Sequence, residues 1–193
     1  MEQILSLLTI LLFVGWRIYW TITEKKADRE KPKTKERPSI FANVRVTRHG
    51  LWLVGLLLLL QFAGLTLFPM PHHWATSFVG LIFVMFGLGL AIVARYQLST
   101  NWANAWEYQI KEKHELITHG VYSVIRHPIY TGIVIAVIGA ELVAQSYLFI
   151  LVCGSFVVAY HQGKKEDSLL ESHFGKPYRD YKKHTRMLIP FLF

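Results

Sequence analysis

The sequence has few cysteines and few charged residues for its length. Its 193 residues include one cysteine, Cys153, so neither an intramolecular disulfide nor a zinc site built from several cysteines can form within the chain. Charged residues make up 18% of the chain, below the roughly 25% of soluble domains. Hydrophobic residues make up 52%, which excludes a disordered chain and disfavours an ordinary soluble domain.

The sequence contains several long apolar stretches. The runs at 51–60 and 78–94 have no polar face to present to water, and the stretches that contain them are typical of membrane-spanning helices. The last stretch, 129–160, is too long for one helix and fits two short helices that meet near Gln145 and Ser146. We therefore expect an all-α, multi-pass integral membrane protein with five transmembrane helices, at about 4–22, 50–68, 74–96 and two within 129–160.

The basic residues indicate how these helices are oriented. Of the 21 lysines and arginines, 20 lie in or at the borders of three polar segments, 24–49, 97–127 and 161–193. The turns at 69–73 and near 145 hold none. Because cytoplasmic loops are enriched in basic residues, the polar segments and the C-terminus should be cytoplasmic, with the N-terminus on the opposite side. The net charge of +8 then reflects topology, and no nucleic-acid partner is expected.

The chain divides into two parts on this interpretation. Residues 1–96 hold three transmembrane helices with a basic cytoplasmic loop at about 24–49, and residues 97–193 hold a connector, a helical hairpin and a C-terminal tail. The connector and the tail lie on the same membrane face and flank the hairpin formed by the fourth and fifth helices. We therefore expect the functional site at this face.

The entrance to the fourth helix carries the sharpest local feature. Pro128 is preorganised for the first helical position, which places His127 at the N-cap and leaves N–H groups of the first turn free. With the permanently charged Arg126 beside them, these groups suit a carboxylate or a phosphate. The alternative is that Arg126 and His127 only anchor the helix at the lipid headgroups. A stripe of small residues predicts close packing of this helix: Gly132, Ala136, Gly139 and Ala140.

An acidic pair occurs at the other end of the hairpin. Glu166 and Asp167 are expected about one turn past the end of the fifth helix, where they can face the entrance to the fourth helix and bind a cation. A negative pair is costly there unless it has a partner. The alternative is an ion pair with Lys164 or Lys165 at a solvated surface.

A tail proline and an intramembrane glutamate predict two further local features. Pro177 can begin a short helix, in which Tyr178 and Tyr181 suit a position at the membrane interface. Glu141 is an ionisable residue deep in the fourth helix and is therefore a functional candidate by default. A hydrogen bond from Glu141 to a neighbouring helix is the interpretation that we favour.

Two motifs, one at each end of the hairpin, resemble those of the isoprenylcysteine carboxyl methyltransferase family. Its superfamily includes membrane phospholipid methyltransferases. The resemblance covers about residues 95–193, whereas the first two helices match only in hydropathy. The matching residues are His114, Leu116, Ile117, Thr118, Gly120, Tyr122, Arg126, His127, Pro128, Tyr130 and Gly132, then Glu166, Asp167, Leu170, Phe174, Gly175 and Tyr178, and finally Ile189, Pro190 and Phe191.

The resemblance implies a membrane methyltransferase that uses S-adenosylmethionine and acts on a lipophilic or lipidated substrate entering from the bilayer. The cofactor is expected in a cytoplasmic pocket formed by the hairpin and roofed by the tail. The nine histidines lack the close spacing of a metal site, so no metal is expected, and no obligatory protein partner or catalytic base is evident. The expected cofactor contacts are Glu107, His114, Leu116, Ile117, Tyr122, Arg126, His127, Pro128, Tyr130 and Glu166.

The chain departs from the family pattern at the expected substrate contact, Gln162. The family usually has an arginine four residues before the glutamate matched by Glu166, where it is thought to hold the substrate carboxylate. The amide of Gln162 donates hydrogen bonds but carries no charge. Two alternatives therefore stay open: a phospholipid or other lipid N-methyltransferase, and a non-catalytic membrane carrier or scaffold for a small molecule.

Overall fold

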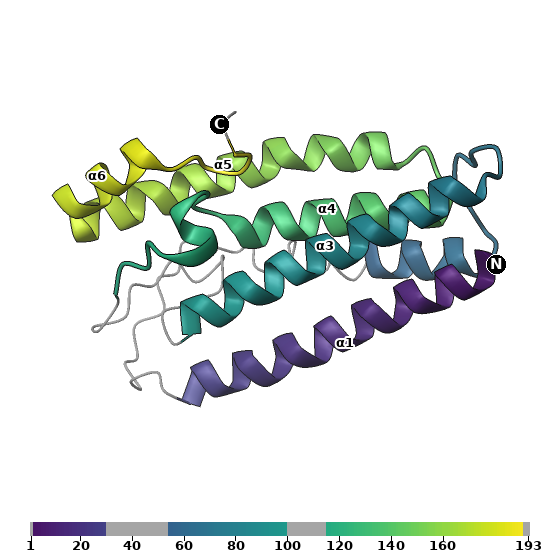
Figure 1. Cartoon of the computed structure of the whole chain (residues 1–193), viewed down its shortest axis with the longest axis horizontal. Helices are drawn as coiled ribbons and strands as arrows, with labels where there is room; N and C mark the ends of the chain where they lie inside the picture. The colour runs from purple at the N-terminus through teal and green to yellow at the C-terminus, as the bar shows by residue number, and fades with distance from the viewer. Residues whose placement is uncertain (1, 30–53, 100–114, 191–193) are drawn as a thin grey trace.

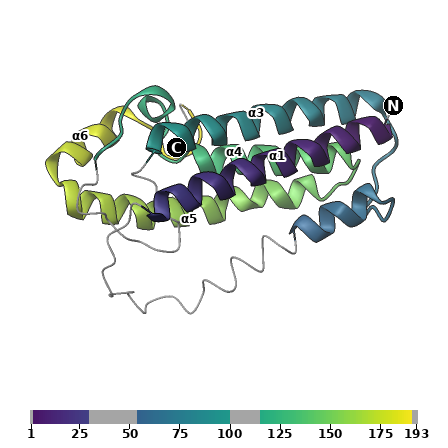
Figure 2. The same ribbon diagram turned by 90° about the horizontal axis from the view of Figure 1, so that it is seen from below.

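The computed structural model describes residues 2–29, 54–99 and 115–190, and these form helices and the connections between them. Four long helices lie lengthwise side by side, and a short helix lies at one end of them (Figures 1 and 2). No strand occurs among the described residues, so the all-α prediction is confirmed for this part of the chain. The elements are α1 (Glu2–Arg29), helical residues 54–62, α3 (Trp74–Leu98), the 3-10 helix η2 (Gly120–Ser123), α4 (Pro128–Val143), α5 (Phe149–Phe174) and α6 (Lys176–His184).

Two of the described helices are long and apolar enough to cross a bilayer. They are α1, which is apolar over Gln3–Lys25, and α3, and they agree with the first and third predicted spans. α4 is apolar but shorter, with 16 residues. Residues 144–148 separate α4 from α5, which confirms the predicted break near Gln145 and Ser146. Most of the predicted basic loop and much of the predicted connector lie outside the described residues.

The helix of the second apolar run ends earlier than the sequence predicts. Its described helical residues are 54–62, whereas the apolar run continues to about residue 68. The amide of Gly64 donates to the carbonyl of Gln61 at 3.0 Å, which tightens the last turn. Gly64 has a φ of 96°, a backbone conformation that glycine adopts readily and that ends the helix. Hydropathy predicts an apolar environment here but carries no information on this turn.

The prediction for the end of the fifth helix was wrong. Apolar residues end near Tyr160, but α5 continues as one helix to Phe174. Leu169 and Leu170 lie half-buried in the polar half of α5, and no proline interrupts the chain before Gly175, whose φ of 62° ends the helix. The acidic pair, predicted beyond the helix, is therefore part of it.

Four glycines allow the backbones of α3 and α4 to come into contact. A Cβ atom added to Gly87 would lie 2.4 Å from the carbonyl oxygen of Gly132, and one added to Gly80 would lie 2.6 Å from that of Gly139. Any larger side chain at these positions would force the helices apart. The predicted role of the small-residue stripe in helix packing is confirmed.

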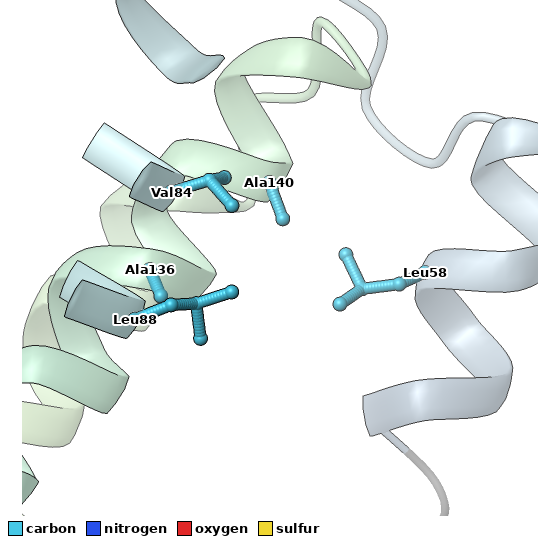
Figure 3. Close-up of a cluster of buried hydrophobic side chains, with 5 residues drawn as sticks. All are labelled: Leu58, Val84, Leu88, Ala136 and Ala140. Atoms are coloured by element: carbon cyan, nitrogen blue, oxygen red, sulfur yellow. The ribbon is translucent and has the colours of Figure 1, made fainter. Parts of the chain in front are cut away.

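The core of the bundle lies against this contact. Val84 and Leu88 of α3 pack with Ala136 and Ala140 of α4, and Leu58 points toward them from helical residues 54–62 (Figure 3). All five are buried. Helical residues 54–62, α3 and α4 therefore share one hydrophobic core.

Glu141 makes the helix-to-helix hydrogen bond that the sequence predicts. Its carboxylate oxygens accept from Nε2 of Gln61 at 3.1 and 3.2 Å. Both side chains are buried, with 1% and 3% exposure respectively. A buried carboxylate needs such a donor, because an unpaired charge is costly in an apolar interior. The bond joins α4 to helical residues 54–62 near the end of the bundle where the chain turns from α4 to α5.

Candidate functional site

The start of α4 has the predicted arrangement, with Pro128 at the first helical position and His127 as the N-cap. The backbone amides before Pro128 are engaged, however. Arg126 N donates to the carbonyl of Arg186 at 2.8 Å, and His127 N donates to that of Met187 at 3.0 Å. Proline has no N–H of its own. These two amides precede the first turn, so the free N–H groups predicted there belong to the residues after Pro128.

The C-terminal segment packs along the chain that leads into α4. Ile125 and Arg186 form a parallel bridge, and the hydroxyl of Thr131 donates to the carbonyl of Leu188 at 2.8 Å. Figure 1 shows α6 and this segment beside the polar half of α5 and the chain leading into α4. Residues distant in sequence thus meet at one end of the bundle.

Helix α6 forms where Pro177 predicts it, but its tyrosines face the protein. Tyr178 is 1% exposed and donates to Oδ1 of Asp167 at 2.6 Å. Tyr181 donates to the carbonyl of Tyr122 at 2.6 Å. The hydroxyls of both tyrosines are thus bound inside the protein, by the Asp167 carboxylate and a backbone carbonyl, and the position of α6 at the membrane interface stays a prediction.

Asp167 is the most heavily hydrogen-bonded acid of the site. It is 3% exposed and accepts from Arg126, whose Nε and Nη2 lie 3.1 and 3.0 Å from Oδ2. Nη1 of the same guanidinium donates to the carbonyl of Thr185 at 2.7 Å. The acidic pair therefore faces the entrance to α4, as the sequence predicts. The alternative in which Lys164 or Lys165 neutralises a solvated pair does not describe Asp167, which is buried against Arg126.

His127 links both acids of the pair. Its Nε2 lies 2.9 Å from Oδ1 of Asp167, and its Nδ1 lies 3.3 Å from Oε2 of Glu166. The ring stacks on that of Tyr130 at 5.6 Å, and a Cβ added to Gly163 would lie 3.0 Å from the imidazole. Ionised carboxylates only accept hydrogen bonds, so the arrangement suits an imidazolium that donates from both nitrogens.

The electrostatics of the pair agree with this charge state. Burial alone would lower the pKa of His127, but hydrogen bonds to Asp167 and Glu166 outweigh it and raise the pKa to about 9. Burial alone would raise the pKa of Asp167, but the hydrogen bond and charge of His127, with Tyr178 and Arg126, lower it to about 2. Burial, then the charge of Asp167, raises the pKa of Tyr178. At neutral pH the site therefore holds an ion pair beside a neutral tyrosine.

Glu166 is the accessible member of the pair. Its side chain is 24% exposed, against 5% for Asp167. Besides His127, it accepts hydrogen bonds from the hydroxyl of Tyr130 and from Nε2 of Gln162 at 3.4 Å. Three donors thus orient one carboxylate, which can still accept a ligand.

The structure brings together most of the predicted site residues that it describes. Tyr122 is buried, and its hydroxyl donates to the carbonyl of Ala94 at 3.4 Å. Leu116 and Ile117 lie half-buried in the segment before η2. Glu107 and His114 lie outside the described residues. Our sequence interpretation named Asp167 as one half of a cation-binding acidic pair but did not include it among the expected cofactor contacts.

Comparison with known proteins identifies the class. Residues 75–177 match the family model for phospholipid methyltransferases. A probable protein-S-isoprenylcysteine O-methyltransferase of Oryza sativa subsp. indica is 30% identical over 134 residues, which cover 65% of this chain and 68% of that protein. Protein-S-isoprenylcysteine O-methyltransferase A of Arabidopsis thaliana is 27% identical over 157 residues, covering 79% of each.

A solved structure shares the fold. The eukaryotic intramembrane Ras methyltransferase ICMT (isoprenylcysteine carboxyl methyltransferase) superposes with a TM-score of 0.65 at 21% identity, covering 95% of this chain and 68% of that one. Helical fold, apolar helices and family match together define an integral membrane methyltransferase. The chain belongs to the phospholipid methyltransferase family, and the predicted resemblance to isoprenylcysteine carboxyl methyltransferases is confirmed.

Proposed function

We propose that this membrane methyltransferase transfers the methyl group of S-adenosylmethionine to the carboxylate of a prenylated cysteine. The observation that carries the proposal is the Glu166 carboxylate, oriented by His127, Tyr130 and Gln162 and still partly exposed. It lies within the residues matched by the family model. The names of the relatives supply the substrate class.

The residues at the site fit this cofactor by charge and polarity. S-adenosylmethionine, when bound, supplies a methyl group on a sulfonium, and it also carries an ammonium group. Glu166 suits either cation, and the half-buried side chains of Leu116 and Ile117 suit a face of the adenine ring. A contact from Arg126 would have to share a guanidinium that already binds Asp167 and Thr185. Glu107 and His114 stay predicted contacts.

The chemistry requires positioning more than proton transfer. A carboxylate acceptor is already ionised near neutral pH, so no side chain need remove a proton from it. The residues at the site need only hold the two reactants in line and exclude water, and effects of this kind supply much of the rate in such displacements. The buried His127–Asp167 pair helps to hold Glu166 in place, because the same imidazole contacts both acids.

We also propose the topology that the basic residues predict, with five spans and a cytoplasmic site. The described helices α1 and α3 supply two of the spans, and α4 with the apolar half of α5 supplies the hairpin. The site lies at the end of the bundle from which the basic segments of the tail extend.

Gln162 favours a second candidate, a lipid N-methyltransferase. An uncharged amide compensates an acceptor carboxylate poorly, whereas it is compatible with an amine. The family model that matches this chain is the one for phospholipid methyltransferases.

One experiment separates these candidates. Detergent-solubilised protein is incubated with radiolabelled S-adenosylmethionine and either a farnesylcysteine analogue or a total lipid extract, and the products are treated with alkali. A methyl ester releases its label as methanol, as we expect for the farnesylcysteine product. Label that survives alkali in the lipid fraction identifies N-methylation instead. Binding of the cofactor without any labelled product supports a non-catalytic carrier.

A further inference from the structure

The carboxylate of Asp167 joins three segments of the site through side-chain hydrogen bonds. It accepts from Arg126 and His127 at the entrance to α4 and from Tyr178 of α6. Asp167 itself belongs to the polar half of α5. With its side chain 5% exposed, it is enclosed by its donors and is poorly placed to touch a ligand. Its role must therefore act through the residues it holds.

His127 is the residue through which Asp167 reaches the accessible part of the site. One ring nitrogen faces Asp167 and the other faces Glu166. Tyr130 stacks on the ring, and Gly163 of α5 lies against its edge. The ring therefore lies in a confined space, with a carboxylate opposite each nitrogen.

The two acids differ in exposure and in their distance from His127, which indicates different roles. Glu166 is partly exposed, whereas Asp167 is enclosed and makes the shorter contact to the imidazole, 2.9 Å against 3.3 Å. A hydrogen bond from Nε2 to Asp167 fixes the plane of the ring and favours a proton on each nitrogen. Nδ1–H then points at Glu166.

We propose that Asp167 is a positioning residue of the methyl-transfer site, which holds His127 as a double donor so that Nδ1–H orients the carboxylate of Glu166. The link to the cofactor rests on the proposed function. The link between Asp167 and His127 rests on the geometry alone.

The charged groups around His127 support this assignment. Glu166 and Asp167 face the ring from α5, Tyr130 faces it from α4, and Met187, which is uncharged, approaches from the C-terminal segment. Arg126 contacts Asp167, and its Nη2 binds Oδ2, whereas Nε2 of His127 faces Oδ1. Two positive and two negative groups thus balance, and removing the charge of Asp167 would leave an excess of positive charge.

The test follows the titration of His127 by NMR in histidine-labelled protein, with the signal assigned from its loss in His127→Gln. We expect His127 in the parent protein to titrate well above its ordinary range. Asp167→Asn should lower that midpoint by about 1–3 pH units, the effect of losing an adjacent opposite charge. Asp167→Glu should restore most of it, and Asp180→Asn, which removes an exposed acid of α6, should leave it unchanged.

The second readout is the affinity for S-adenosylmethionine as a function of pH. Asp167→Asn should weaken binding roughly tenfold at neutral pH, equivalent to about 1.4 kcal/mol, and shift the pH profile with the His127 midpoint. A parent His127 that titrates at or below its ordinary range overturns the proposal, even if Asp167→Asn does not fold. An Asp167→Asn protein that is less stable but keeps the parental midpoint and pH profile overturns it as well. If the parent binds no cofactor, the proposed function fails, and the NMR titration still decides the role of Asp167.

Discussion

Gly87 of α3 and Gly132 of α4 approach so closely that a Cβ atom on Gly87 would lie 2.4 Å from the Gly132 carbonyl oxygen. Gly87→Ala should therefore destabilise the bundle by roughly 1–3 kcal/mol, the usual cost of overpacking, because the clash is with backbone. Gly89, two residues along α3, has no atom within 4 Å of an added Cβ. Gly89→Ala should be neutral or stabilising by about 0.5–1 kcal/mol. Thermal unfolding in detergent measures both, and equal midpoints would contradict the close helix contact.

The His127–Asp167 pair predicts how stability depends on pH. The pKa of His127 is about 9 in the folded protein against 6.5 ordinarily, so its contribution is complete below pH 6.5 and is lost as pH rises through 9. The pKa of Asp167 is about 2 against 3.8, so its contribution is complete above pH 3.8 and is lost as pH falls through 2. The free energy of unfolding should fall by on the order of 3 kcal/mol between pH 6.5 and 9.

His127→Gln should remove most of this alkaline loss of stability, because glutamine does not titrate. Substitution of the exposed His161 of α5 by glutamine is the matched control and should keep the parental curve. If the free energy of unfolding of the parent protein does not change between pH 6.5 and 9, His127 gains no proton on folding.

Glu166 and His127 should each contribute to cofactor affinity. Glu166→Gln and His127→Ala should weaken S-adenosylmethionine binding by about 1.5–3 kcal/mol, the scale of a hydrogen bond to a charged group. Calorimetry on folded, solubilised protein measures the effect. Glu171 lies on α5 as Glu166 does, and Glu171→Gln, which breaks the ion pair to Lys182 of α6, should leave the affinity unchanged. Parental affinity in both site variants would favour the scaffold interpretation.

Gln162 offers a test of the acceptor. If the acceptor is a prenylcysteine carboxylate, Gln162→Arg should raise activity on prenylcysteine analogues by roughly 10- to 100-fold, because a charged partner replaces a neutral amide. If the native acceptor is an amine or a neutral lipid, the same change should depress native activity. If the prenylcysteine activity is no higher than the parent's, another cation already binds the substrate carboxylate. Lys164 and Lys165 are the nearest candidates in sequence.

The proposed topology is tested by labelling single cysteines in intact cells, in a protein whose exposed native Cys153 is replaced by alanine. Cysteines placed at Pro71 and at Thr34 should react with an impermeant reagent from opposite sides of the membrane. Reaction of both from the same side would rule out the five-helix arrangement.

Hydropathy and helix signals in the sequence predicted much of the fold. Pro128 and Pro177 marked the starts of α4 and α6, and the length of the last apolar stretch required a break near Gln145. The end of α5 was wrong because hydropathy reports contact with lipid, whereas a helix continues through polar residues until a breaker such as Gly175.

The site was predictable only in part. The sequence motifs predicted His127 and Glu166 as site residues. Which acid of the Glu166–Asp167 pair is accessible depends on burial, which the sequence does not show. Asp167 is enclosed because Tyr178 and Arg126 converge on it from separate segments. Such convergence is a property of the tertiary structure; the resemblance singles out Glu166, but the residue types alone do not show which acid is buried.

On the proposed function, the unbroken course of α5 gives a length scale for an acceptor that lies along this helix. Val158, which is 70% exposed in the apolar half of the helix, lies eight residues before Glu166, a separation of about 12 Å along the axis. A molecule with its tail beside Val158 and its reactive group near Glu166 must therefore be an amphiphile whose head and tail are separated by roughly this distance.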